Sequence, residues 1–293
     1  CELVEAVLGV HLRLYGRKMI RVCRHAESEL QNGTLREENV ILLCQVLNSS
    51  RYCSVSLGDQ ETMFLLSYSS LSMPEADLLS LSSALQKELF EEVSSRAALA
   101  LVDNVYLTLS DLLEEYTPST RDIPRSQSVS LLQHVLQSTR RTLRLMENSL
   151  SEQIFQEVWR SSSAFMDSKL TSSLPERFHC LDSHESSTLV GDLRTIPSVF
   201  SECAAKPWNY FPQLREATLL LETPFPDIQD VEGCLLDVEH QNAQSVVESL
   251  SMGAALHLLK DLSGRRQEVC QQFSSILHLA FPLCRKILAI RFK

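Results

Sequence analysis

The chain has 293 residues, 44% of them hydrophobic, with 27 lysine and arginine residues against 37 aspartate and glutamate residues, a formal net charge of −10. This acidic balance argues against a dedicated nucleic-acid binder, which needs a basic surface. Glycine occurs only 8 times and proline 10 times. Sheet proteins need many tight turns and therefore many glycines, so the composition favours an all-α chain of long helices.

The sequence gives three hints about cellular environment. It has no run of the roughly 18 apolar residues that a membrane-spanning helix requires. It begins at Cys1 without a signal-peptide pattern, so we expect a part of a longer protein. Its nine cysteines include no Cys-x-x-Cys pair, and residues such as Cys44 and Cys284 lie among helical apolar residues, where a reduced thiol acts as a small hydrophobe. We therefore expect a cytoplasmic protein.

The N-terminal part reads as three helices. The first spans 2–30, ends at an Asn-Gly turn, and carries an apolar stripe at helical spacing. The second spans 36–53 and a short third lies near 59–70. The residues of the first stripe are Leu3, Val7, Val10, Leu14 and Ile20.

Two long helices are predicted next, because glycine is absent from both and proline from their interiors. The first spans 75–116 and the second 126–174, with a proline-containing loop at 117–125. Two helices of similar length joined by a short loop form an antiparallel hairpin in which each covers the apolar stripe of the other.

Beyond Pro175 the predicted elements shorten. We expect helices near 186–204, 207–221, 241–263 and 266–291, and the acidic, proline-opened stretch 222–240 reads as a surface loop.

The whole chain is predicted to be an elongated rod of stacked antiparallel helical bundles. We expect two regions within it, 1–125 ending in a long helix and 126–293 forming a C-terminal bundle.

Sites for nucleotides and metals find little support. Neither the phosphate-binding Gly-x-x-x-x-Gly-Lys-Ser/Thr loop nor the dinucleotide-binding Gly-x-Gly-x-x-Gly loop occurs. The best metal candidate combines His179, Cys180 and His184 with Cys203, since zinc accepts imidazole and thiolate ligands. Adjacent ligands fit one tetrahedral ion poorly, so the interpretation favoured here is a polar loop between helices. We expect no cofactor and no metal.

The sequence gives equally little support for a catalytic site. No serine or cysteine stands on a glycine-rich strand-to-helix turn of the Gly-x-Ser-x-Gly type. The histidines at 134, 257 and 278 fall within helical patterns and are interpreted as surface or interhelical residues. We therefore expect a protein that is not an enzyme.

One basic pattern stands out in the first helix. Arg13, Arg17, Arg21 and Arg24, with Lys18, recur every three or four residues and so share a helix face. Such a stripe can bind an acidic partner or an anionic membrane surface, and the alternative is a solvated face that pairs with acidic neighbouring helices. A second, weaker cluster comprises Arg140, Arg141 and Arg144.

Four segments of the C-terminal half resemble a known family. They are 192–200 (DLRTIPSVF), 206–211 (KPWNYF), 214–217 (LREA) and 250–261 (LSMGAALHLLKD). In these segments the chain is similar to the C-terminal region of the RINT-one/Tip-twenty family. It differs from that family by the acidic segment 222–243 between the matching blocks, and the matching residues are of a packing type rather than a catalytic one.

The resemblance implies a specific role. Members of the family are non-enzymatic subunits of the Dsl-one/NRZ tethering complex at the endoplasmic reticulum (ER), which captures vesicles returning from the Golgi. They are helical rods that bind sibling subunits and SNAREs. The resemblance thus implies a hetero-oligomeric protein, held at the ER membrane through its partners, without nucleic acid and without catalytic residues.

Two other functions remain open from the sequence. The first is a helical adaptor or scaffold of another assembly, such as another tether or a kinetochore, chromatin or ciliary complex, because a helical fold does not fix function. The second is a small helical enzyme or metalloprotein that uses the region of His179 to His184.

Overall fold

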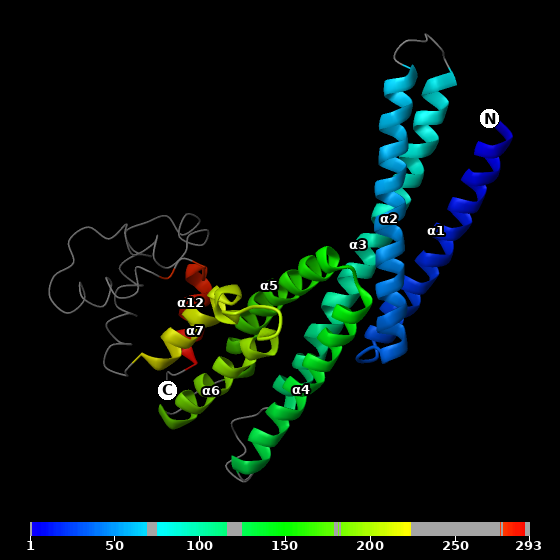
Figure 1. Ribbon diagram of the computed structural model, residues 1–293. Coiled ribbons are helices and arrows are strands. Elements are labelled where there is room, and N and C mark those ends of the chain that lie inside the picture. The colour runs from blue at the N-terminus through cyan, green and yellow to red at the C-terminus, as the bar shows by residue number, and fades with distance from the viewer. Residues whose placement is uncertain are drawn as a thin grey trace, which may run out of the picture. The chain divides into compact units, whose positions relative to one another are not determined.

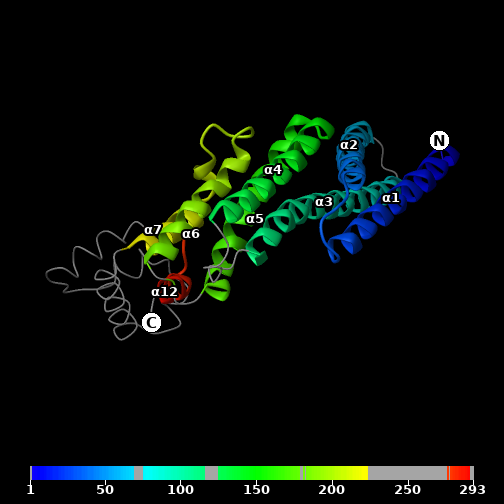
Figure 2. The ribbon, with the colours of Figure 1, turned by 90° about the horizontal axis from the view of Figure 1, so that it is seen from below.

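The structure, a computed structural model, describes residues 2–68, 75–115, 125–178, 181, 183–223, 276 and 278–290. Figures 1 and 2 show it in two orientations. Every regular element among these residues is an α-helix or a 3₁₀-helix, and long α-helices account for most of them. The predicted all-α fold class is therefore confirmed for the described residues.

Helix α1 (Glu2–Leu30) has the predicted bounds. It ends because Gly33 adopts φ 135°, a conformation that glycine reaches without steric cost. Helix α2 (Glu37–Tyr68) is continuous, so the prediction of separate helices at 36–53 and 59–70 was wrong. Gly58 lies within α2 and keeps a helical backbone, since a glycine weakens a helix without necessarily ending it.

Helix α3 (Glu75–Glu115) matches the first predicted long helix. The second is divided into α4 (Arg125–Ser149) and α5 (Glu152–Arg177), so the prediction of one uninterrupted helix over 126–174 was wrong. Residues 117–124 of the connecting loop predicted at 117–125 lie outside the described residues.

A side chain from α2 holds the break between α4 and α5. The Nδ2 group of Asn48 donates to the Ser149 carbonyl oxygen at 2.8 Å, and its Oδ1 accepts from the Ser151 amide at 3.1 Å. One carboxamide thus satisfies a carbonyl at the end of α4 and an amide at the start of α5, which the broken helix would otherwise leave without partners.

The C-terminal elements are shorter than predicted. Helix α6 (Ser183–Thr195) is followed by the 3₁₀-helices η1 (Ile196–Phe200) and η2 (Pro207–Tyr210) and by α7 (Pro212–Glu222). The last helix, α12 (Phe281–Ala289), follows the non-helical residues 276 and 278–280, so the prediction of one continuous helix near 266–291 was wrong there. Residues 266–275 lie outside the described residues. The predicted loop at 222–240 and the helix at 241–263 lie almost wholly outside the described residues.

The chain divides into two compact units, each built from two stretches of sequence. The first combines Cys1–Asp111 with Gln137–Ser162, and the second combines Leu112–Leu136 with Ser163–Lys293. The changes from one unit to the other fall within α3, α4 and α5. The boundary expected between residues 125 and 126 remains a prediction.

In the first unit α1 packs against α2 (Figure 1) and also contacts α3. The buried side of α1 is formed by Met19, Cys23 and Ala26, together with Gly16. Val10 and Leu14 were expected on this apolar stripe, yet their side chains are 45% and 57% exposed. The side of α1 that contacts the core therefore differs from the side on which the predicted apolar stripe lies.

In the second unit α7 contacts both α6 and α12 (Figures 1 and 2). Six residues of α7 are buried, on several sides of the helix, so α7 is the central helix among the described elements of this unit. Throughout the described part of the chain, no helix combines the length and apolar character needed to cross a membrane.

Candidate functional site

The basic stripe of α1 keeps the arrangement expected from its spacing. At about 100° per residue, Arg13, Arg17, Arg21 and Arg24 fall within a sector of about 80°. All four side chains are exposed, as is that of Lys18. The stripe faces away from the buried side of α1, because Met19, Cys23 and Ala26 lie on the opposite part of the helix.

The charges of this stripe have little compensation from described acidic residues, although the charge of Arg24 helps to lower the pKa of Glu27. Residues 9–26 contain no aspartate or glutamate. Within the described part of the chain, Arg13, Arg17 and Arg21 form no ion pair, whereas Arg141 of the second basic cluster pairs with Glu37 at 2.7 Å. The α1 stripe is thus a local basic surface on an acidic protein.

Segments 192–200, 206–211 and 214–217, for which the sequence predicts a resemblance to the RINT-one/Tip-twenty family, contribute to the core of the second unit. Most of their apolar side chains are almost fully buried, and the rings of Phe200 and Phe211 lie with centroids 5.7 Å apart. The buried members are Leu193, Ile196, Val199, Phe200, Phe211, Leu214 and Ala217. Their role in this structure is packing. The block at 250–261 lies outside the described residues.

A buried carboxylate from α5 caps the start of α7. The two carboxylate oxygens of Asp167 accept the backbone amides of Gln213 at 3.0 Å and Leu214 at 2.7 Å. Pro212, the first residue of α7, has no amide hydrogen to satisfy, and Phe211 offers no side-chain cap. Asp167 therefore supplies from a distant helix the acceptors that a capping residue normally provides. Burial raises the pKa of its carboxyl group, and the two amide hydrogen bonds oppose that rise.

A second buried carboxylate connects α7 to the segment before α12. Glu216 is 5% exposed, and its oxygens accept the backbone amides of His278 and Leu279, each at 3.0 Å. Its Oε1 also lies 2.7 Å from Nδ1 of His278. His278 was expected inside a helix but precedes α12, so that interpretation was wrong about its local structure. Glu216 fixes the position of this non-helical segment.

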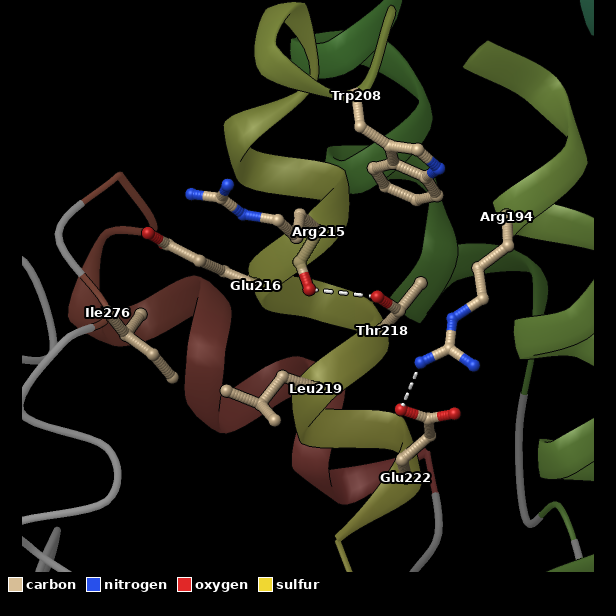
Figure 3. A pocket seen from close by; sticks show the side chains of 8 residues that line it. All are labelled: Arg194, Trp208, Arg215, Glu216, Thr218, Leu219, Glu222 and Ile276. Carbon is tan, nitrogen blue, oxygen red and sulfur yellow. Dashed lines mark hydrogen bonds and ion pairs between the residues drawn. The ribbon is translucent and has the colours of Figure 1, made fainter. Parts of the chain in front are cut away.

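A hollow of about 420 Å³ lies beside α7 in the second unit (Figure 3). Trp208, Leu219 and Ile276 give it apolar walls. Figure 3 shows Arg194 of α6 reaching Glu222 of α7, with Arg194 Nη2 to Glu222 Oε2 at 2.6 Å. The hollow can hold an apolar side chain next to charged groups, and the described residues of its lining include no cysteine, serine or histidine to act as nucleophile or base.

The predicted metal and histidine positions are only partly described. His179, Cys180 and His257 lie outside the described residues. His184 is exposed in α6, Cys203 is partly buried in the turn after η1, and His134 is exposed on α4. Within the described residues, no group of three or more histidine, cysteine, aspartate or glutamate side chains is arranged to hold a metal ion.

The buried cysteines have the environment of core residues. Burial raises the pKa of Cys23 to about 11 and that of Cys44 to about 12. It also raises the pKa of Cys284, with a further contribution from the nearby Glu216 carboxylate. Because the thiolate is the reactive form, these thiols are poor nucleophiles at neutral pH.

Sequence reasoning identified the arginine stripe but missed Asp167 and Glu216. The signal for Asp167 is indirect: a helix that starts at Pro212 after Phe211 has no local capping side chain. Comparisons with protein-family models, with curated proteins and with solved structures find no match to this chain.

Proposed function

We propose that this chain is a non-enzymatic subunit of an ER-associated tethering complex that acts in Golgi-to-ER retrograde vesicle transport. The proposal rests on the resemblance of residues 192–217 to the RINT-one/Tip-twenty family. The observation that best supports it is that the resembling apolar residues lie together in one core, with Phe200 and Phe211 in contact. Packing residues of this kind indicate a fold, and a tethering subunit acts through its fold rather than through catalytic groups.

In this proposal the mechanism is mechanical rather than chemical. The chain is an elongated rod of stacked antiparallel helical bundles that binds sibling subunits and a SNARE at separate places. Such a rod brings a vesicle and the ER membrane together before fusion. The protein lies on the cytoplasmic side of the ER membrane and is held there by its partners, as a member of a hetero-oligomer.

The partner prediction is tested by affinity purification of the tagged protein from cells, followed by mass spectrometry. The proposal predicts recovery of sibling tether subunits and of ER SNAREs in amounts well above a tag-only control. Glu147→Gln, at an exposed position on α4 outside the resembling segments, is the control variant, and it should retain these partners. Recovery of neither tether subunits nor ER SNAREs would overturn the proposal.

The shape is tested separately by small-angle X-ray scattering on the purified protein. A compact chain of 293 residues has a radius of gyration of about 19 Å. A rod of stacked bundles predicts a clearly larger value and a distance distribution with a long tail. A radius of gyration of about 19 Å would contradict the predicted rod. It would not bear on the predicted partners, which the affinity purification tests.

The second candidate function is an adaptor or scaffold subunit of another multiprotein assembly. Arg13, Arg17 and Arg21 are exposed and form no ion pair within the described part of the chain, which favours a binding protein without pointing to a tether. The same purification distinguishes the two, because an adaptor would return a different stable assembly. Metal analysis of the purified protein tests the enzyme or metalloprotein alternative, which predicts stoichiometric zinc that is lost on changing Cys180 or His184.

A further inference from the structure

The exposed face of α1 combines positive charge with apolar surface. Val10 falls inside the sector of the four arginines and Leu14 about 20° beyond it, at about 100° per residue. These two side chains are 45% and 57% exposed, although both are aliphatic. The face therefore offers a short apolar strip next to the guanidinium groups of Arg13, Arg17 and Arg21.

The opposite face of α1 is already occupied. Met19, Cys23 and Ala26 are buried in the first unit, and the Gly16 backbone lies against Leu89 of α3. A helix that binds a lipid surface does so by burying its apolar face at the level of the headgroups. Since the main apolar face of α1 is buried in the protein, Val10 and Leu14 are the aliphatic side chains that this face exposes among the residues whose side chains are described, and two such side chains are too few for stable membrane anchoring.

We propose that this face binds an acidic amphipathic helix of a partner protein. Arg13, Arg17 and Arg21 follow one another at intervals of four residues, about 6 Å along the helix axis. A partner helix with aspartate or glutamate side chains every three or four residues presents carboxylates at the same interval. Guanidinium groups bind carboxylates with two parallel hydrogen bonds, and the apolar side of the partner helix covers Val10 and Leu14.

The inference concerns the chemistry of the partner and does not depend on the tethering role. It is tested on the purified full chain with two synthetic helical peptides of identical composition. In the first, the glutamates occupy one face beside a row of leucines, and in the second the glutamates are spread around the helix. Vesicles of phosphatidylcholine and phosphatidylserine form a third arm, and binding is followed by fluorescence anisotropy or co-sedimentation.

We expect the one-faced peptide to bind, with an affinity that falls as salt rises from about 0.05 M to about 0.3 M. The double variant Arg17→Glu, Arg21→Glu should weaken this binding at least about tenfold. Leu14→Gln should weaken it severalfold without altering its salt dependence. Arg36→Glu is a single charge reversal at an exposed position outside the stripe, and it should leave the affinity unchanged.

Three results would overturn the inference. The first is equal affinity of the unchanged chain and the double variant for the one-faced peptide. The second is equal binding of the two peptides, which would indicate attraction to charge alone. The third is binding of the anionic vesicles without binding of the one-faced peptide, which would assign the stripe to a lipid surface. Because these assays need no tether component, they are decided independently of the purification from cells.

Discussion

Gly16 allows α1 to approach α3 closely in the first unit. A Cβ atom at this position would lie 2.6 Å from Cδ2 and 3.0 Å from Cγ of Leu89. Gly58 also lies within a helix, but a Cβ atom there would meet nothing nearer than the end of the Lys87 side chain at 3.8 Å. The two glycines therefore differ in what surrounds them rather than in their helical conformation.

Gly16→Val should lower the free energy of unfolding by about 1–3 kcal/mol, because the added atoms overlap Leu89 in a packed contact. Gly58→Val is the matched control and should stay within about 0.5 kcal/mol of the unchanged protein. Urea denaturation followed by circular dichroism measures both. Equal effects of the two substitutions would show that Gly16 is not needed for close approach.

The pKa of Glu27 is lowered in the folded protein. Both Nε and Nη2 of Arg96 donate to its carboxylate oxygens at 2.8 Å, and this pairing outweighs the opposing effect of burial. A carboxyl group with a lower pKa in the folded than in the unfolded state binds fewer protons when folded. Its stabilisation is therefore present above its ordinary pKa of 4.5 and is lost as the pH falls further.

Glu27→Gln should consequently reduce stability at pH 7 and reduce it less at acidic pH. The effect is modest, since the Glu27 side chain is 38% exposed and water screens the pair. Unfolding free energies of the variant and the unchanged protein, measured at neutral pH and below pH 4.5, should converge on acidification. Glu147→Gln, at an exposed position on α4, is the control. A Glu27→Gln difference that does not change with pH would contradict this account.

At the scale of the elements, the sequence predicted helices better than it predicted their interruptions. The C-terminal end of α1 followed from a local signal, the Asn32-Gly33 turn. The break between α4 and α5 did not, because the apolar pattern continues through Leu150 into α5. What stabilises the break is Asn48, some 100 residues earlier in the chain. Tertiary contacts of this kind are not visible in a local pattern.

Asn48→Ala should lower the free energy of unfolding by about 1–3 kcal/mol, because it leaves the Ser149 carbonyl and the Ser151 amide without their partner. Thermal unfolding followed by circular dichroism measures the change, provided that the folded variant has the same helix content as the unchanged protein. Asn148→Ala, at an exposed position just before the break, should be nearly neutral. Equal effects of the two alanine substitutions would show that the carboxamide of Asn48 does not stabilise the break.

The cap of α7 is a second feature that the sequence could not supply. The residues 206–217 were recognised as a packing block, and the burial of Phe211 and Leu214 agrees with that interpretation. Their position nevertheless depends on Asp167, which lies 46 residues before Gln213 in sequence. A buried aspartate in the middle of α5 has no local pattern that distinguishes it from a surface residue.

Asp167→Ala should destabilise the second unit by about 2–3 kcal/mol, since two amides at the start of α7 lose their acceptor. Asp167→Asn should cost less, because one amide oxygen can still accept a hydrogen bond. Hydrogen exchange of the α7 amides measures the change directly. If the two substitutions were equivalent, or if the control Asp192→Ala had the same effect, the capping role would be wrong.

At the scale of the whole molecule, the net charge of −10 conceals a local basic surface. The sequence placed the four arginines correctly on one helix face, because their spacing alone decides which side they share. It placed Val10 and Leu14 on the wrong side, since apolar residues at helical spacing were assumed to contact the core. Which stripe becomes buried depends on the neighbouring helices, and here Gly16, Met19 and Cys23 determine it.

The central claim, that this chain is a subunit of a vesicle tether, is tested most directly with purified proteins. The chain is mixed with a purified Zw-ten-like sibling subunit and with the cytoplasmic domain of an ER SNARE. Light scattering after size-exclusion chromatography then gives the mass of each species. The account predicts a stable species whose mass equals the sum of the chain and at least one of these partners. Elution of the chain by itself with every partner, while the partners still bind one another, would contradict it.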